Sequence, residues 1–239
     1  MPKKSAESRA ERTAALMKEQ QRKERMRQLG IVGAIMALLA IVVVIGIVVM
    51  GNADKTSSST VADSEFGLAL GPDDAPTKVV VYEDFLCPAC GYFEKITHEK
   101  FTAAAAAGKV QVEYRPFYFL QNPDFEEYSL RATNAFRAVW EQQGEEAAMV
   151  MHNALFAEQP SESGPFPDDD WLVQKAVAAG ATESEVRPAI EDLEFKDWVN
   201  DATKDASEIR ATPTIYLNGK LVEASSLDES AQIVLDAIG

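Results

Sequence analysis

Residues 29–50 contain no charged side chain and consist mainly of Ile, Val, Leu and Ala. A helix of this length would measure about 33 Å, enough to cross a hydrocarbon core of about 30 Å. Core helices of globular proteins are rarely apolar on every face over such a length. The apolar part of a cleaved signal peptide is shorter, about 7–15 residues, and no convincing cleavage site follows Met50. The segment therefore predicts an uncleaved signal anchor.

The residues on either side of this segment predict its orientation. Residues 1–28 carry nine Lys or Arg and four Glu, a net charge of +5, within a chain whose total is −15. The rest of the chain accordingly has a net charge of −20. The positive-inside rule makes residues 1–28 a cytoplasmic tail and places everything after Met50 outside the membrane. Residues 51–66 have the composition of a flexible linker. The acidic balance argues against nucleic-acid binding, because phosphate contacts need Lys and Arg.

Residues 67–239 begin with a β-α-β pattern. Thr77–Tyr82 is a β-branched apolar run, typical of a buried central strand. A helical stretch follows to about Ala107, and Lys109–Tyr118 alternates like a second strand. This order implies two parallel strands joined by a right-handed crossover.

Residues 122–209 have helical patterns almost throughout. The Asp168–Asp170 run is expected to cap one helix, and Thr182 with Glu185 matches a capping box. Three tryptophans are expected to act as core or interface anchors. The predicted helices and tryptophans in this block are Phe125–Gln143, Glu145–Phe156, Trp171–Ala179, Glu191–Ile209, Trp140, Trp171 and Trp198.

A hairpin and a helix complete the sequence. Thr214–Leu217 and Lys220–Val222 flank Asn218-Gly219, a strong hairpin signal, and Asp228–Ile238 is amphipathic. The order β-α-β, helices, β-β-α predicts an α/β, thioredoxin-like fold with an inserted helical domain, preceded by one transmembrane helix.

The two cysteines of the chain, Cys87 and Cys90, lie between the first predicted strand and its helix. The unpaired N–H groups and the dipole of a helix N-terminus stabilise a thiolate, the reactive form of cysteine. Cys87 is expected at this terminus with its sulfur exposed, and Pro88 suits the first turn. Cys90 is expected one turn later, more buried and able to form a disulfide with Cys87. This context predicts a redox pair.

Three other roles are possible for a pair of cysteines. A structural disulfide closing so short a loop would add only about 2 kcal/mol. Two sulfurs can bind Cu(I), but His98 and His152 are distant in sequence and no Met lies beside the motif, so no metal site is predicted. Two permanently reduced core cysteines do not suit an extracytoplasmic domain. No cofactor is predicted.

Two motifs over residues 67–239 resemble the DsbA family of thiol–disulfide oxidoreductases. The first runs from Gly71-Pro72-Asp73-Asp74-Ala75-Pro76 into VVVYEDFLCPAC. The second, Ala211-Thr212-Pro213-Thr214, precedes a strand and Asn218-Gly219-Lys220 and resembles the family's cis-proline loop. The helical insertion matches the family's arrangement. The N-terminal anchor is similar to the form found in Gram-positive bacteria, including actinobacteria.

The resemblance implies roles for individual residues. Cys87 would form the mixed disulfide with substrate, and Cys90 would be the resolving thiol. Pro213 would be cis and face the disulfide, leaving the Thr212 backbone free to pair with a substrate strand. Phe85, Leu86, Pro88 and Ala89 are expected to contact substrate. Core packing is the other interpretation for the members of a possible apolar rim, namely Phe85, Leu86, Tyr92, Phe93 and Phe117.

Two positions depart from the family pattern. Ala89 replaces a frequent histidine between the cysteines, and Val81 replaces a buried acid found in many members. Asp84 is expected to be a solvated loop acid rather than a proton relay, and His98 a partly exposed helix residue. The redox direction stays open, because about −270 mV for thioredoxin and about −120 mV for DsbA differ by roughly 7 kcal/mol.

The predicted function is an extracytoplasmic thiol–disulfide oxidoreductase that introduces disulfides into exported, cysteine-containing proteins. The resemblance implies a membrane redox partner of the DsbB-like or VKOR-like type. The alternatives are a disulfide reductase or isomerase, for example in cytochrome c maturation, and a Cu(I) metallochaperone or non-catalytic chaperone on the same fold.

Overall fold

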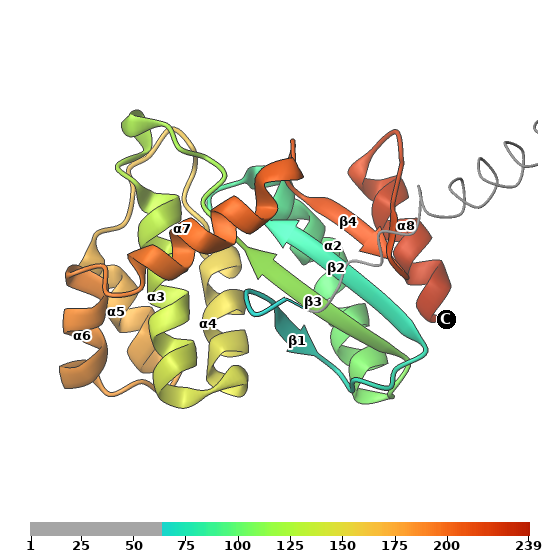
Figure 1. Ribbon diagram of the computed structural model, residues 1–239, viewed down its shortest axis with the longest axis horizontal. Coiled ribbons are helices and arrows are strands. Elements are labelled where there is room, and N and C mark those ends of the chain that lie inside the picture. Colours follow the sequence, from blue (N-terminus) through green and yellow to red (C-terminus); the bar gives the residue numbers. More distant parts are fainter. Residues whose placement is uncertain (1–63) are drawn as a thin grey trace, which may run out of the picture. The chain divides into compact units, whose positions relative to one another are not determined.

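The computed structural model describes residues 64–239, which form a five-stranded sheet covered by helices, with further helices at one end (Figure 1). The predicted tail 1–28, the predicted anchor 29–50 and most of the predicted linker lie outside the described residues. None of the helices within 64–239 combines the length and hydropathy that a membrane crossing requires.

The predicted β-α-β unit is present at the centre of the sheet. Strands β2 (Thr77–Glu83) and β3 (Val110–Pro116) pair in parallel and are joined by α2 (Pro88–Ala106). Strand β4 (Thr214–Leu217) lies antiparallel on the other side of β2. Because β2 has a neighbour on both sides and helices on both faces, its residues are nearly all buried. This position explains its continuous apolar sequence.

The edges of the sheet are short strands. The turn at Asn218 and Gly219, both with positive φ, leads into β5 (Lys220–Leu221), as the hairpin signal predicted. On the opposite edge, β1 (Leu68–Leu70) pairs antiparallel with β3. This strand was not predicted, because three residues are too few to show an alternating pattern.

Helices cover the two faces of the sheet. Helices α2 and α8 (Leu227–Ile238) pack with Val79, Val81 and their neighbours on one face. On the other face, Val80 and Tyr82 pack against residues of α7 (Lys196–Asp205) and the 3-10 helix η2 (Ala206–Glu208).

The inserted block has its own apolar core beyond the carboxyl ends of β2 and β3. It contains η1 (Pro123–Phe125), α3 (Tyr128–Gln143), α4 (Glu145–Ala157), α5 (Asp169–Ala178), α6 (Glu183–Glu191) and α7. Trp140, Trp171 and Trp198 are partly buried against this core, as anchors should be. Both cysteines and the two residues before Cys87 belong to the same cluster. The helical block therefore forms part of the surroundings of the redox motif.

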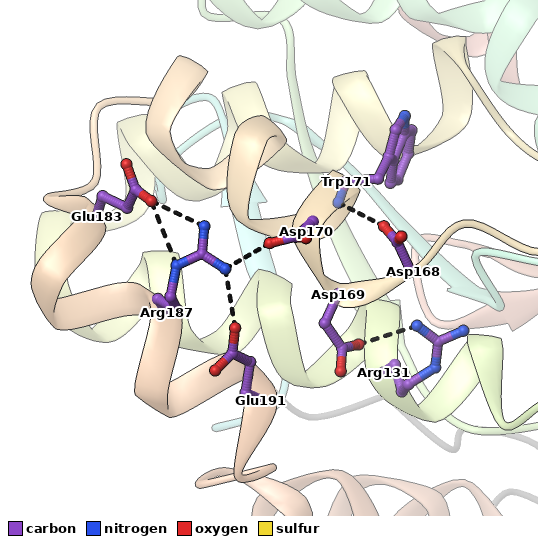
Figure 2. A network of polar contacts seen from close by, with 8 residues as sticks. All are labelled: Arg131, Asp168, Asp169, Asp170, Trp171, Glu183, Arg187 and Glu191. Carbon is purple, nitrogen blue, oxygen red and sulfur yellow. Dashed lines mark hydrogen bonds and ion pairs between the residues drawn. The ribbon is translucent and has the colours of Figure 1, made fainter.

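Polar contacts connect α5 to α3 and α6 (Figure 2). Asp168 caps α5 as predicted, accepting a 3.0 Å hydrogen bond from Trp171 N. Arg187 of α6 reaches Asp170 at 2.6 Å and also pairs with Glu183 and Glu191 of its own helix. Arg131 of α3 pairs with Asp169 at 2.9 Å. These partly exposed pairs fix the relative placement of helices more than they add stability.

Two predictions for this block are wrong. Thr182 precedes α6, but its side chain makes no capping hydrogen bond, so the capping box does not form. The helix expected over Glu191–Ile209 is interrupted, because Leu193 adopts a φ of 51° and α7 begins only at Lys196. The buried side chain of Asn134 in α3 explains the break. It accepts from Phe195 N at 2.8 Å and donates to Ala189 O at 3.0 Å.

Candidate active site

Cys87 occupies the N-cap position of α2, with extended backbone angles, and Pro88 follows in the first turn. The Cys87 carbonyl accepts hydrogen bonds from the N–H groups of Cys90 and Gly91, which closes that turn. Cys87 is only 7% exposed and Cys90 2%. Cys87 is therefore more buried than expected, because it packs into the apolar cluster of the helical block.

The Thr212-Pro213 loop lies against Cys87, although Thr212 is 125 residues further along the chain. The Cys87 thiol donates to the Thr212 carbonyl oxygen, with Sγ and O 3.3 Å apart. The Thr212–Pro213 peptide bond is cis, as the resemblance implied. The Thr212 hydroxyl oxygen is buried and has no hydrogen-bond partner within residues 64–239. The fold thus brings together the two motifs singled out in the sequence.

The pKa values of the two thiols are shifted in opposite directions. A hydrogen bond from the Cys90 thiol lowers the pKa of Cys87 to about 6. Burial opposes this shift, and the Thr212 side chain and the backbone N–H groups of Cys90 and Ala89 support it. Burial is the main cause that raises the pKa of Cys90 well above its ordinary value, and the hydrogen bond and charge of Cys87 add to it. The pair therefore holds one thiolate, on Cys87, at neutral pH.

The residues beside the cysteines differ in their access to a substrate. Pro88 is exposed and Ala89 and Pro213 are half-buried, so these can contact an approaching chain. Phe85 and Leu86 are completely buried, which corrects the expectation that they contact substrate. Their side chains fill the core of the helical block instead. Of the other rim candidates, Phe93 and Phe117 are core residues, and Tyr92 is 43% exposed.

Asp84 is completely buried, so the expectation of a solvated loop acid is wrong. Its Oδ1 accepts from Leu86 N at 2.8 Å. Its Oδ2 accepts from the N–H groups of Phe119 and Leu120, both at 2.9 Å, and from Ser129 Oγ at 2.6 Å. Burial raises the pKa of Asp84, and these donors oppose the rise. The carboxyl group joins the loop before Cys87 to the loop after β3 and to α3.

A second buried acid, Glu83, pairs with His152 of α4 at 2.6 Å. Burial raises the pKa of Glu83, and the nearby Glu83 charge contributes to the raised pKa of Cys90. His98 is partly exposed, as expected, and bonds Glu94 at 2.8 Å. The two histidines considered as metal ligands thus each contact a glutamate.

Sequence reasoning missed several residues that hold the site. His152, Ser129 and Gln159 all come from the helical block, and no local pattern marks them. Gln159 donates from Nε2 to the carbonyl oxygens of Phe85 and Cys87, both at 3.0 Å. The only signal was Glu83-Asp84 itself, because two adjacent acids at the end of a buried strand require partners.

The sequence model of the family described as Thioredoxin matches residues 63–237. This chain belongs to the thioredoxin family. It is 26% identical over 159 residues to the probable disulfide bond formation protein D of Bacillus cereus, covering 64% of this chain and 70% of that protein. This member of the thioredoxin family is a thiol–disulfide oxidoreductase of the DsbA type.

Solved structures of thioredoxin-family oxidoreductases share the fold. The reduced DsbG of Mycobacterium tuberculosis superimposes with a TM-score of 0.62 at 30% identity, covering 74% of this chain and 94% of that one. Reduced DsbA from the same organism gives a TM-score of 0.59 at 29% identity, with 72% and 95% covered. The predicted α/β, thioredoxin-like fold with a helical insertion is confirmed.

Proposed function

We propose that this oxidoreductase works as an oxidase, which introduces disulfides into exported proteins through Cys87 and Cys90. The observation that carries the proposal is the difference in acidity between the two thiols. Cys87 has its pKa lowered to about 6, whereas the pKa of Cys90 is raised. A stabilised Cys87 thiolate favours the reduced enzyme, and an enzyme whose reduced form is favoured is oxidising.

The reaction proceeds by two thiol–disulfide exchanges. A substrate thiolate attacks Cys87 Sγ of the oxidised pair, so that a substrate–Cys87 disulfide forms while the Cys87–Cys90 bond breaks. Cys90 leaves and, because its pKa is raised, takes up a proton. A second substrate thiolate then attacks the substrate sulfur, and Cys87 leaves as its stabilised thiolate. Two electrons pass from the substrate thiols to the enzyme, which ends with both cysteines reduced.

Substrate contact is assigned to the accessible part of the site. Exposed Pro88 and half-buried Ala89 follow Cys87 in the chain, and half-buried Pro213 follows Thr212. An extended substrate segment would pair with the backbone of Thr212 while its cysteine meets Cys87. This arrangement favours unfolded or partly folded protein substrates, since a strand-like segment must be free.

The same proposal includes the location and the partner. Residues 29–50 would anchor the protein in the cell membrane by a single pass, with residues 1–28 in the cytoplasm and the domain outside. The positive charge before the apolar run and the negative charge after it support this orientation. Because each reaction leaves the enzyme reduced, a membrane protein of DsbB-like or VKOR-like type would reoxidise it.

The deciding experiment measures the reduction potential of the Cys87–Cys90 pair in glutathione buffers, with thioredoxin as reference. A potential closer to about −120 mV than to about −270 mV is expected. A value at the thioredoxin end would reject the oxidase in favour of a reductase.

Trapping of substrates tests the assigned nucleophile. The C90S variant should accumulate mixed disulfides with exported proteins on non-reducing gels, and C87S should not. Trapping by C87S and none by C90S would overturn the assignment of Cys87.

A further inference from the structure

The side chain of Gln159 connects the helical insertion to the loop that carries Cys87. Gln159 follows α4, and its amide Nε2 lies 3.0 Å from the carbonyl oxygen of Phe85 and 3.0 Å from that of Cys87. A glutamine amide has two N–H donors, so each hydrogen serves one carbonyl. The amide therefore joins the carbonyl of the N-cap residue of α2, Cys87, to that of Phe85 two residues earlier.

Gly91 provides the space that this contact needs. A Cβ atom at position 91 would lie 2.3 Å from Oε1 of Gln159 and 3.0 Å from its Cδ. Glycine in a helix is less favourable than alanine, and the φ of Gly91 is not positive, so the backbone does not require it. The absence of a side chain at position 91 is explained by the position of Gln159.

The hydrogen bond from Gln159 is made to the carbonyl group of Cys87, the residue whose sulfur reacts. The Cys87 carbonyl that accepts from Gln159 also accepts from Cys90 N at 3.0 Å and Gly91 N at 3.1 Å. Those bonds close the first turn of α2, and this turn directs the N–H groups of Ala89 and Cys90 towards the Cys87 sulfur. The Gln159 N–H dipoles also present their positive ends to the residue that carries the thiolate.

We propose that Gln159 is a positioning residue for Cys87, and that Gly91, which has no side chain, leaves the space that the Gln159 amide occupies. Gln159 holds the carbonyls of Phe85 and Cys87 so that the first turn of α2 stays closed beneath the sulfur. The redox site is thereby coupled to the helical insertion. This inference rests on the proposed role of Cys87 as the nucleophile.

Two substitutions, one at each partner of the contact, test the proposal. Q159A removes the amide, whereas G91A leaves it intact and displaces it, because the flexible end of Gln159 gives way more easily than the helix. The readouts are the Cys87 thiolate titration, followed by ultraviolet absorbance of the reduced protein, and the reduction potential. Each variant should hold about threefold less thiolate than wild type at pH 6, the effect of one modest hydrogen bond. Q174A, at an exposed glutamine of α5, is the matched control and should titrate like wild type.

The double variant G91A/Q159A separates positioning from general damage. If the added methyl acts only by displacing Gln159, the double variant titrates like Q159A and the two effects do not add. An unchanged titration in Q159A, or fully additive effects, would overturn the proposal. If Q159A does not fold, G91A alone decides the outcome, because alanine favours the helix. A titration near pH 6 that persists in C87S would reject the nucleophile assignment instead, independently of Gln159.

Discussion

His152 Nε2 lies 2.6 Å from Glu83 Oε1, and both side chains are shut off from solvent. Glu83 ends the central strand, and His152 belongs to α4 of the helical insertion. The histidine ring also packs against Tyr114, with the ring centroids 4.4 Å apart. A buried polar pair thus joins the sheet to the insertion beneath the cysteines.

This pair predicts a loss of stability at alkaline pH. Burial alone would lower the pKa of His152, but the charge and hydrogen bond of Glu83 outweigh it and raise the pKa from 6.5 to about 9. A folded-state pKa above the unfolded value gives stabilisation that is complete below pH 6.5 and is lost as the pH rises through about 9. Urea unfolding of the oxidised protein should show this decline, because the lowered pKa of the Cys87 thiol would oppose it in the reduced protein. The E83Q/H152Q variant, which lacks the titrating pair, should show a flatter profile, and parallel profiles would contradict the prediction.

Asp84 is predicted to be a structural acid whose loss destabilises the domain. D84A would leave three backbone N–H groups and the Ser129 hydroxyl without their acceptor. Unsatisfied buried donors cost about 1–3 kcal/mol each, so a loss of at least about 3 kcal/mol is expected in urea unfolding. S129A, which removes one donor, should cost about 1 kcal/mol. Similar losses in the two variants would show that the backbone donors find other partners.

The Cys90 thiol is expected to set the acidity of Cys87. Its hydrogen bond is the largest contribution to the lowered Cys87 pKa of about 6. C90A should therefore move the thiolate titration of Cys87 towards the ordinary cysteine range. C90S keeps a hydroxyl donor at the same place and should stay closer to wild type. The pH dependence of alkylation by iodoacetamide measures both, and equal midpoints for C90A and wild type would exclude this role.

The hydroxyl group of Thr212 is expected to help lower the pKa of Cys87. That oxygen is buried without a partner among the described residues, and the Thr212 side chain helps to lower the Cys87 pKa. The simplest account is that the hydroxyl donates to the sulfur once the thiol has lost its proton. T212V should raise the Cys87 midpoint, and T212S should preserve it. Identical midpoints in T212V and T212S would leave the hydroxyl without this function.

Much of the fold was predictable because its signals are local. The apolar run of β2, the helix start at Pro88 and the Asn218-Gly219 turn depend on neighbouring residues, and all three were placed correctly. The break at Leu193 was not, since its cause is Asn134, a residue of another helix. A leucine with positive φ has no sequence signature comparable to glycine.

The residues of the site also fall into two groups, those that local motifs reveal and those whose contacts are distant in sequence. Cys87, Cys90 and the Thr212-Pro213 loop could be found from motifs and their context. The burial of Asp84 could not, because its donors Phe119, Leu120 and Ser129 lie 35 to 45 residues away. Phe85 and Leu86 were misassigned for a related reason, since they precede the cysteine in sequence but face the core of a helical block far along the chain.

The separation of 125 positions between Cys87 and Thr212 has a consequence for biosynthesis. Chains are made from the N-terminus, so both cysteines leave the ribosome long before Thr212 and β4, which pairs with β2. Gln159 and Thr212 contact Cys87 only when most of the domain has been synthesised. A nascent chain therefore carries two ordinary thiols, and the activated cysteine exists only in the finished domain.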